Sequence, residues 1–511
     1  MLVKTYGYAV YGIEALPITV ETNIGKGINF FMVGLPDSAV KESHQRIKAA
    51  FTNTELKFPR KEITINMAPA DIRKEGSAYD LTIAVGVLAA SEQILEEEIA
   101  DYLIMGELSL DGGLRPIRGA LSMAIKAKEQ GFKGFILPKQ NAREVSIVEG
   151  LNIYGIESIT EVVGFFNKTI DLDPFQYVAD DDAYDCSEFA IDFEDVKGQE
   201  NVKRALEIAA AGGHNILLVG PPGSGKTMLA KRLPSILPQL TLEEALETTK
   251  IHSVAGLVGE NRGLLTTRPF RSPHHTVSDV ALVGGGSNPK PGEISLAHNG
   301  ILFLDELPEY KRQVLEVMRQ PLEDRVVSIS RAKMSVEYPA GFMLVASMNP
   351  SPSGNFYDPN DPNSDPEYIV KRYMNKISGP LMDRIDLHIE VPAVRFDELA
   401  KGPKGETSFT IRQRVMETRK IQEERFKNIP KIHYNAQLHS KLIEKFCRID
   451  EIGMAMLKNA MDKMGLSARS YARILKVSRT IADMDSSQGI AAHHIAEAIQ
   501  FRSLDKNNWL E

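Results

Sequence analysis

The sequence predicts an α/β protein of several domains that ends in a helical region. With 511 residues the chain is too long for one hydrophobic core, so two to four domains are expected. Strand patterns such as GFILP and ILFLD alternate with helical patterns such as SHQRIKAAFTN up to about residue 395. Beyond that point the periodic segments, among them SYARILKVSRTIADM, are helical.

The composition is that of an ordinary water-soluble protein, with 43% hydrophobic and 25% charged residues. No apolar run reaches the roughly 18 to 20 residues that span a bilayer, and the first segment lacks a signal-peptide core. We therefore expect a cytoplasmic protein without membrane association. The net charge of -8 weighs mildly against nucleic-acid binding, although local patches decide such binding more than the sum does.

The order of patterns predicts four parts. Residues 1–168 form an α/β domain with strands in EITINMAP, GFILP and LNIYGI, and residues 169–190 contain the acidic run ADDDAYD, which is typical of a solvated linker. Residues 191–395 form a second α/β unit, and residues 396–511 form the helical region. The two cysteines, Cys186 and Cys447, are too few for a disulfide framework or a cysteine-built metal site.

The stretch GPPGSGKT, between an apolar strand and a helix, is typical of a loop that binds the phosphates of a nucleoside triphosphate. Its glycines let backbone amides turn toward the phosphates. We expect Lys226 to contact the β and γ phosphates of ATP and the Thr227 hydroxyl to ligate Mg²⁺. The predicted nucleotide-binding residues are Gly220, Pro221, Pro222, Gly223, Ser224, Gly225, Lys226, Thr227 and Met228.

The stretch ILFLDE predicts a second part of this site, because a buried strand carries two carboxylates to the edge of the sheet where ligands bind. We expect Asp305 to hold Mg²⁺ through water and Glu306 to polarise the attacking water as general base. Asn349, at the end of FMLVASMN, is predicted to orient that water as a sensor. The alternative for Asn349 is a turn asparagine before Pro350.

Two arginines are candidates for contacts with the transferred phosphoryl group. Arg384, in GPLMDRIDL, is predicted to act as an arginine finger on the nucleotide of a neighbouring subunit. Arg469, in SARSYAR, is predicted to sense the γ-phosphate from the helical region, and Arg473, one turn later, is its rival. A surface ion pair is the alternative for each of them.

The run RPFRSPHHTVSDVALVGGGSNPKPGEISLAHNGILFLDELPEY, with GPPGSGKT before it and SGPLMDRIDL after it, resembles the magnesium-chelatase-like AAA+ ATPases of the YifB/ComM family. The resemblance covers almost the whole chain. It implies a Lon-protease-like N-terminal α+β domain, an AAA+ P-loop NTPase core and a C-terminal α-helical lid, assembled with ATP into a hexameric ring. Characterised members migrate branched DNA during natural transformation, so the resemblance implies an ATP hydrolase with helicase or translocase activity on single-stranded or branched DNA.

Two departures from the family pattern carry further predictions. Relatives often have Cys-Pro-Cys-Gly as a zinc site where Ser351 and Ser353 stand here, and serine hydroxyls are poor zinc ligands, so no zinc is predicted. The first domain resembles the parts of Lon that hold its Ser-Lys dyad. Leu121 falls at the lysine position, and Ala78 fits the serine position as well as Ser77 does, so proteolysis is not expected.

The expected DNA contacts lie in two insertions. The segment Thr249–Ala297 is long and rich in glycine and proline, and its basic residues include Arg268, Arg271 and Lys290. The segment RVVSISRAKMSVEYPAGF predicts a β-hairpin with Arg331 and Lys333 near its tip. A ring would bring such tips together at its pore, so we predict that Arg331, Lys333 and Lys290 contact the DNA backbone. A solvated turn is the alternative for the tip.

Two other classes of function fit parts of the pattern. A chelatase motor that drives Mg²⁺ insertion into a porphyrin shares the AAA+ core but would not need the Lon-like domain. A protein-remodelling or proteolytic machine would depend on Ser77. His274 and His275 lack a third clustered ligand, so we expect them to form hydrogen bonds in a loop rather than to bind a metal.

Overall fold

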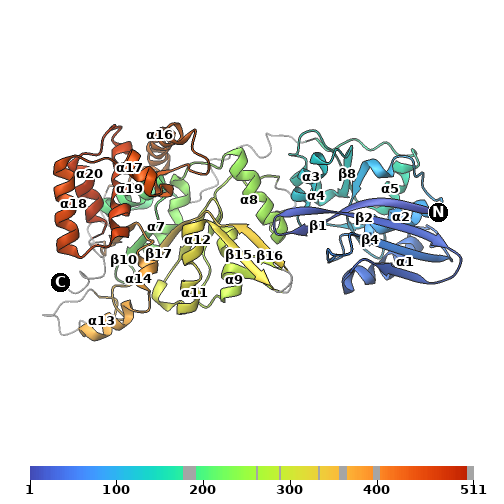
Figure 1. Cartoon of the computed structure of the whole chain (residues 1–511), viewed down its shortest axis with the longest axis horizontal. Helices are drawn as coiled ribbons and strands as arrows, with labels where there is room; N and C mark the ends of the chain where they lie inside the picture. The colour runs from blue at the N-terminus through green and yellow to red at the C-terminus, as the bar shows by residue number, and fades with distance from the viewer. Residues whose placement is uncertain are drawn as a thin grey trace. The chain divides into compact units, whose positions relative to one another are not determined.

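The chain forms two compact units in the computed structural model (Figure 1). Unit 1 contains residues 1–184 and 241–266, and unit 2 contains residues 185–240 and 267–511. The residues that the structure describes are 1–176, 191–259, 263–286, 289–331, 334–355, 365–394 and 403–502. Most of the predicted acidic linker therefore lies outside the described residues.

A seven-stranded mixed sheet is the centre of unit 1, with the order β3-β4-β2-β1-β5-β8-β9. Strand β2 pairs antiparallel with β1 and β4, whereas β5, β8 and β9 run parallel. The strands predicted in EITINMAP, GFILP and LNIYGI are confirmed as β4, β8 and β9. The strands are β1 (Leu2–Tyr11), β2 (Glu14–Gly25), β3 (Phe30–Val33), β4 (Glu62–Ala68), β5 (Tyr102–Ile104), β8 (Gly134–Pro138) and β9 (Asn152–Ile156).

Helix α2 (Asp80–Ala90) is the most deeply buried helix of unit 1, because every one of its residues is buried. It contacts both β1 and β2. A helix that is apolar all round is stable only inside a core, which is what the stretch DLTIAVGVLAAS requires. The other elements of this unit are α1 (Ser38–Asn53), α3 (Ala120–Glu129), α4 (Lys139–Val145), α5 (Ile159–Phe166) and the short strands β6 (Glu107–Leu108) and β7 (Leu114–Arg115).

Helix α8 (Leu242–Ala255) belongs to unit 1, although in sequence it follows the predicted nucleotide-binding loop. It begins with a capping box, in which the side chains of Thr241 and Glu244 accept hydrogen bonds from each other's backbone amides. Its last turn packs on α3, where the Gly119 amide donates to the Ser253 carbonyl at 3.1 Å. The buried side chain of Glu144 also interacts with Ser253.

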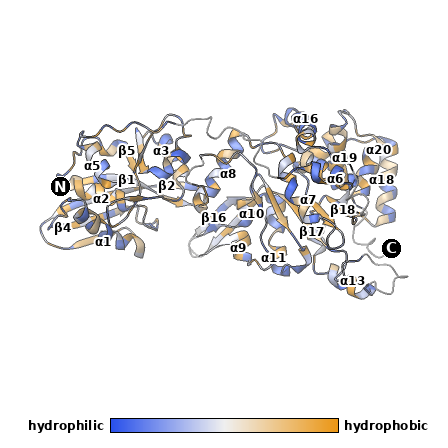
Figure 2. Ribbon diagram, turned by 180° about the vertical axis from the view of Figure 1, so that it is seen from behind, coloured by the Kyte–Doolittle hydropathy of each residue, from blue (hydrophilic) through white to orange (hydrophobic). Residues whose placement is uncertain are grey.

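A five-stranded parallel sheet is the centre of unit 2, with the order β11-β14-β17-β10-β18. The three middle strands are buried along their whole length, which accounts for their continuous apolar sequences. Strand β17 is drawn in the colour of hydrophobic residues in Figure 2. The strands are β11 (Phe270–Arg271), β14 (Ile301–Leu304), β17 (Met343–Met348), β10 (Ile216–Val219) and β18 (Leu387–Glu390).

The region after residue 403 is helical, as predicted, and its helices α16 and α19 contact α6 of the sheet region. The predicted helices in SYARILKVSRTIADM and HIAEAIQFR are confirmed as α19 and α20. Among the described residues, no helix combines the length and the apolar composition that a bilayer crossing requires. The helices are α6 (Glu200–Gly212), α16 (Ser408–Phe426), α17 (Ser440–Phe446), α18 (Glu451–Met464), α19 (Ala468–Met484) and α20 (Ala492–Gln500).

A buried carboxylate joins the parallel sheet to these helices. Asp386, directly before β18, accepts hydrogen bonds from the Asn215 amide at 3.1 Å and from Arg473 of α19 at 2.6 Å. Burial alone would raise the pKa of Asp386, but Arg473 and His214 hold it below its ordinary value. Asp386 therefore stays charged and fixes α19 against the sheet.

We predict that Glu144→Gln stabilises the protein at pH 8 and that the gain is smaller near pH 5. Burial raises the pKa of the Glu144 carboxyl above its ordinary value, so the folded protein keeps a proton that the unfolded chain has lost. Between these two pKa values the free energy of unfolding falls as the pH rises, and a neutral amide removes that loss. Thermal unfolding at both pH values is the measurement, with exposed Glu149→Gln as control. An equal shift at both pH values would contradict this account.

Candidate functional site

The C-terminal ends of β10, β17 and β14 bring the predicted nucleotide residues to one edge of the parallel sheet. Strand β17 lies between the other two, with Val219 of β10 opposite Met348 and Leu304 of β14 opposite Ala346. Gly220, Asn349 and Asp305 each follow directly after one of these strands. Since ligands of open α/β sheets bind at this edge, the strand register itself assembles the candidate site.

The glycines of the loop that follows β10 are required by its backbone. Gly223 and Gly225 have φ values of 76° and 90°, which residues with a Cβ rarely adopt. A Cβ at Gly220 would lie 2.2 Å from the Val391 carbonyl oxygen. The Ser224 hydroxyl is buried and has no hydrogen-bond partner among the described residues. A tight loop with an unsatisfied polar group fits a bound triphosphate.

Lys226, the first residue of α7 (Lys226–Arg232), lies at the centre of the site. Its ammonium donates to the carbonyls of Gly220 and Pro221, at 2.7 and 2.9 Å, and to the Asn349 side-chain oxygen at 3.2 Å. Burial lowers the pKa of Lys226, and the Asp305 carboxylate partly offsets that effect. The structure thus places the predicted phosphate-binding lysine and the predicted sensor in direct contact.

Asp305 is oriented by two hydroxyl groups. Thr227 donates to one carboxylate oxygen at 2.7 Å, and Ser347 of β17 donates to the other. Hydroxyl and carboxylate oxygens are suitable ligands for a hard cation. The side chains of Thr227 and Asp305 therefore fit their predicted role as Mg²⁺ ligands. When bound, Mg²⁺ supplies positive charge that stabilises the phosphoryl oxygens.

Glu306 has a left-handed backbone, with φ of 54°, and a largely exposed carboxylate. Such conformations are uncommon for residues other than glycine and cluster at functional sites. One carboxylate oxygen lies 3.4 Å from Nδ1 of His275. The predicted loop hydrogen bond is present for His274, whose Nδ1 is 2.9 Å from the Thr276 hydroxyl. The contact of His275 with Glu306 was not predicted, because no local pattern relates the two residues.

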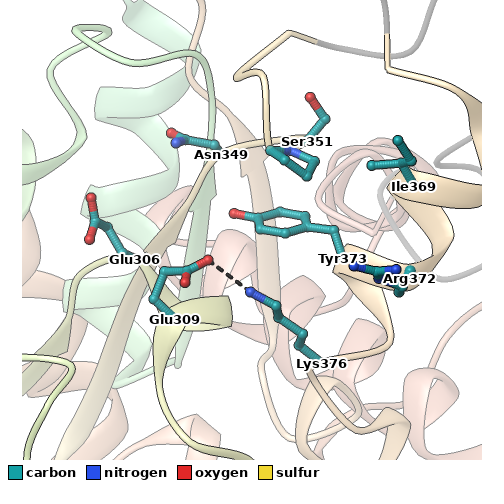
Figure 3. A pocket seen from close by; sticks show the side chains of 9 residues that line it. Glu306, Glu309, Asn349, Ser351, Ile369, Arg372, Tyr373 and Lys376 are labelled. Atoms are coloured by element: carbon teal, nitrogen blue, oxygen red, sulfur yellow. Dashed lines mark hydrogen bonds and ion pairs between the residues drawn. The ribbon is translucent and has the colours of Figure 1, made fainter.

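An open cavity of about 460 Å³ lies beside Glu306 and Asn349 (Figure 3). Helix α13 (Glu367–Met374) supplies Tyr373 to its wall, and Lys376 pairs with Glu309 across it at 3.0 Å. Burial raises the pKa of Tyr373 to about 12, so its hydroxyl remains protonated at neutral pH. Sequence reasoning missed this wall, because α13 carries no recognisable motif.

Arg384 is buried in the turn between α14 (Gly379–Met382) and β18. Its guanidinium pairs with Glu323 of α12 (Arg319–Asp324) at 2.5 Å and donates to the Pro380 carbonyl. Among the described residues, its Nε has no hydrogen-bond partner. A contact with the nucleotide of a neighbouring subunit therefore requires this side chain to separate from Glu323.

Arg469 and Arg473 make different contacts. Arg473 pairs with the buried Asp386, so it has a structural role. Arg469, at the start of α19, is more than half exposed and lies 3.7 Å from Asp383. A loose, exposed ion pair of this kind stabilises little, which leaves Arg469 as the better candidate for a nucleotide sensor.

The predicted hairpin is present as β15 (Val326–Arg331) and β16 (Met334–Pro339). Lys333 lies outside the described residues, and Arg331 is described by its backbone alone. Lys290 is exposed in a second hairpin, formed by β12 (Gly284–Gly285) and β13 (Lys290–Pro291). The Tyr338 hydroxyl donates to the Pro289 carbonyl at 2.7 Å, which ties the two hairpins together.

Two other basic residues of this insertion, Arg268 and Arg271, serve the fold. Arg268 donates to the carbonyls of Pro238 and Asn299 at 2.6 and 2.8 Å. Arg271 forms a bidentate pair with Glu293, at 2.6 and 2.8 Å. Both side chains therefore hold the insertion in place.

The loop that follows β17 is held by hydrogen bonds to oxygen atoms. The hydroxyls of Ser351 and Ser353 are 3.0 Å apart, and the Ser353 amide donates to the Asp365 carboxylate at 2.7 Å. These hydrogen bonds hold the pKa of Asp365 below its ordinary value. The absence of zinc stays a prediction.

Unit 1 gives no support for the Ser-Lys dyad. The Ser77 hydroxyl donates to the Glu107 carboxylate, and Leu121, at the predicted lysine position, is completely buried. Lys74, close to Ser77 in sequence, donates to the Pro69 carbonyl. A serine nucleophile of this type needs the amine at its hydroxyl, and the described contacts of Ser77 do not provide one.

Three family models match the chain along its length. The model for "Magnesium chelatase, subunit ChlI" matches residues 192–399, which contain the candidate nucleotide site. "Subunit ChlI of Mg-chelatase" matches residues 20–141, and "Magnesium chelatase, subunit ChlI C-terminal" matches residues 405–502.

Two relatives match nearly the whole chain, and a third matches only part of it. The chain is 45% identical over 508 residues to "Competence protein ComM" of Haemophilus influenzae, which covers 98% of both chains. It is also 45% identical over 503 residues to "Uncharacterized protein YifB" of Escherichia coli, covering 98% of this chain and 96% of that one. "Lon protease 2" of Bacillus subtilis is 31% identical over 159 residues, 28% of this chain and 27% of its own. The chain therefore belongs to the YifB/ComM family of magnesium-chelatase-like AAA+ ATPases.

We predict that alanine substitutions separate the roles of Arg469 and Arg473. Arg473→Ala should lower the free energy of unfolding by about 3–5 kcal/mol, because it leaves the buried Asp386 without its cation. Arg469→Ala should change that free energy by less than about 0.5 kcal/mol but should slow ATP turnover. Urea unfolding and phosphate release are the measurements. Wild-type stability in Arg473→Ala would show that Asp386 does not depend on this pair.

Proposed function

We propose that this protein is a cytoplasmic ring motor that uses ATP hydrolysis to move along single-stranded or branched DNA. Its task would be helicase action and branch migration in the recombination that follows DNA uptake in natural transformation. The observation that carries the proposal is the 45% identity, over 98% of both chains, with a protein named for competence. The family resemblance implies the DNA substrate.

The chemistry proposed for the site follows from its geometry. Glu306 accepts a proton from the attacking water, and Asn349, held by Lys226, orients that water. Lys226 balances charge on the phosphates, and Thr227 and Asp305 hold Mg²⁺. The proposed finger Arg384 is buried against Glu323 of its own chain, and we propose that it separates from Glu323 to reach the nucleotide of the neighbouring subunit.

The DNA contacts would come from the two joined hairpins. Lys290 is exposed on the β12–β13 hairpin, which is tied to β15–β16 through Tyr338. In a hexamer these hairpins would be repeated around the ring, so their positive charge would be concentrated despite the acidic total. Such contacts neutralise backbone phosphates and do not read sequence.

Forked DNA should increase ATP turnover of the full-length protein, and the increase should fall as salt rises. Lys290→Ala should weaken DNA binding and lower its salt slope by about one unit, while turnover without DNA stays at the wild-type rate. Lys458→Ala removes the same charge from an exposed position on α18 and serves as control. Absence of both DNA binding and stimulation at low salt would refute the DNA proposal.

Mixing two inactive variants tests whether each active site is shared between subunits. Glu306→Gln removes the base and Arg384→Ala removes the finger, so each variant alone should lose about 10²–10⁴-fold in turnover. In mixed rings an intact Glu306 can face an intact Arg384, and turnover should exceed that of either parent. Mixed assembly is verified by pull-down through a tag on one variant. Mixed rings that are no more active than the parents would exclude a finger supplied in trans.

A further inference from the structure

The cavity shown in Figure 3 adjoins a second cavity of about 440 Å³. Both cavities are lined by Glu309, Arg372 and Lys376, so together they form one groove, which we call the α13 groove. Its inner end is the cavity that contains the proposed catalytic base and sensor, Glu306 and Asn349. Its outer end is lined by neither of them. The groove therefore leads away from the proposed catalytic groups.

Cationic side chains dominate the lining of this groove. Arg372 and Lys376 line both cavities, and Arg312, the first residue of α11 (Arg312–Glu316), lines the outer one. Lys376 pairs with Glu309 at 3.0 Å, but both side chains are nearly half exposed, so this pair is weak and can be exchanged. Arg372 forms no ion pair with any residue that the structure describes. The groove therefore has cationic groups available for an anion.

The inner end of the groove also offers a neutral hydrogen-bond donor. The side chain of Tyr373 is buried, and its hydroxyl points toward Glu306 and Asn349 and contacts the Asn349 backbone (Figure 3). Its raised pKa, about 12, keeps the proton on the hydroxyl at neutral pH. The Lys376 ammonium lies 5.5 Å from the centre of the same ring. An anion beside the proposed base and sensor would thus meet this hydroxyl and, beyond it, Arg372 and Lys376.

The proposed hydrolysis of ATP leaves two anions at this edge of the sheet. ADP stays in the loop after β10, whereas inorganic phosphate is repelled by the ADP phosphates and by the carboxylates of Asp305 and Glu306. Phosphate oxygens accept charge-assisted hydrogen bonds, and an arginine guanidinium can offer them two parallel donors. Because product release limits the rate of many enzymes, a binding site for the departing phosphate would affect turnover.

We propose that the α13 groove binds the inorganic phosphate that ATP hydrolysis produces and conducts it out of the catalytic site. Tyr373 and Arg372 bind the phosphate first. Lys376 then exchanges its contact with Glu309 for one with the phosphate, and Arg312 attracts it to the outer end. This inference rests on the proposed ATP hydrolysis, but phosphate binding in the groove can be tested without nucleotide.

The first test measures how added inorganic phosphate inhibits ADP formation by the full-length protein, with sodium chloride of equal ionic strength as reference. A hydrogen bond to a charged group typically corresponds to tenfold or more in affinity, so Arg372→Ala should raise the inhibitory phosphate concentration about tenfold. Arg372→Lys keeps the charge and should retain part of the inhibition. Lys371→Ala is the matched control, because Lys371 is exposed on the same helix and pairs with Glu367 outside the groove.

A single-turnover experiment separates phosphate release from cleavage. Acid quenching measures the phosphate that is formed, and a fluorescent phosphate sensor measures the phosphate that is released. In Arg372→Ala, release should lag further behind cleavage than in the wild type, while cleavage keeps its rate. A slower cleavage step would instead assign Arg372 to the hydrolysis reaction and would overturn the proposal.

A third measurement uses neither nucleotide nor DNA. Lys226→Ala removes the cation of the loop after β10, so phosphate that still binds this variant must bind elsewhere. The ³¹P resonance of inorganic phosphate should be broadened by full-length Lys226→Ala protein, and sulfate should reverse the broadening. Adding Arg372→Ala to this variant should remove most of the effect, and adding Lys371→Ala should not. Thermal unfolding of each variant is the folding control.

The outcomes distinguish this inference from the proposed function. Wild-type phosphate inhibition in Arg372→Ala, or the same loss of inhibition in Lys371→Ala, would overturn the groove as a phosphate site. If Arg372→Ala weakens DNA binding and leaves phosphate inhibition unchanged, the groove binds DNA phosphates and the proposal is wrong. If the wild type hydrolyses no ATP, the proposed function fails, whereas the ³¹P measurement still decides whether the groove binds phosphate.

Discussion

The register of three parallel strands is the constraint on which the site depends. Because β17 pairs with both β10 and β14, the strand ends lie side by side and present Lys226, Asn349 and Asp305 to one another. A slip of one residue in either pairing would move the side chains of the slipped strand to the opposite face of the sheet. The buried apolar faces of the strands set this register, so the core of unit 2 determines the geometry of the candidate site.

Charged groups connect this sheet edge to the helical region. In the short segment from Asp383 to Asp386, each of three charged residues has a partner on a helix outside the segment. Asp383 and Asp386 pair with arginines of α19, and Arg384 pairs with Glu323 of α12. The strong Asp386 pair is buried, whereas the Asp383 pair is exposed and weak. Asp383 and Asp386 lie in the same turn as Arg384. A change in the position of α19 would therefore shift the backbone that carries Arg384.

Local sequence patterns were sufficient to predict the loop after β10 and the strand β14. The phosphate loop and the strand carrying Asp305 and Glu306 follow from backbone rules and strand patterns, and they appear where they were expected. The partners of Arg384 and Arg473 could not be predicted, because Glu323 and Asp386 reach them only through tertiary packing. The pairing of His275 with Glu306 belongs to the same class, since it depends on β11 lying beside β14.

The path of the chain around α8 could not be predicted from sequence patterns either, because it depends on tertiary contacts. Residues 241–266 lie within the stretch that matches the chelatase ATPase model, yet they pack with unit 1. The chain therefore passes between the two units at both ends of this segment, in addition to the connection near residue 185. An ATPase fragment cut out at the linker would carry α8 without Gly119 and Glu144, which contact its Ser253. The two units are thus interlaced in the covalent chain and cannot be separated by a single cut.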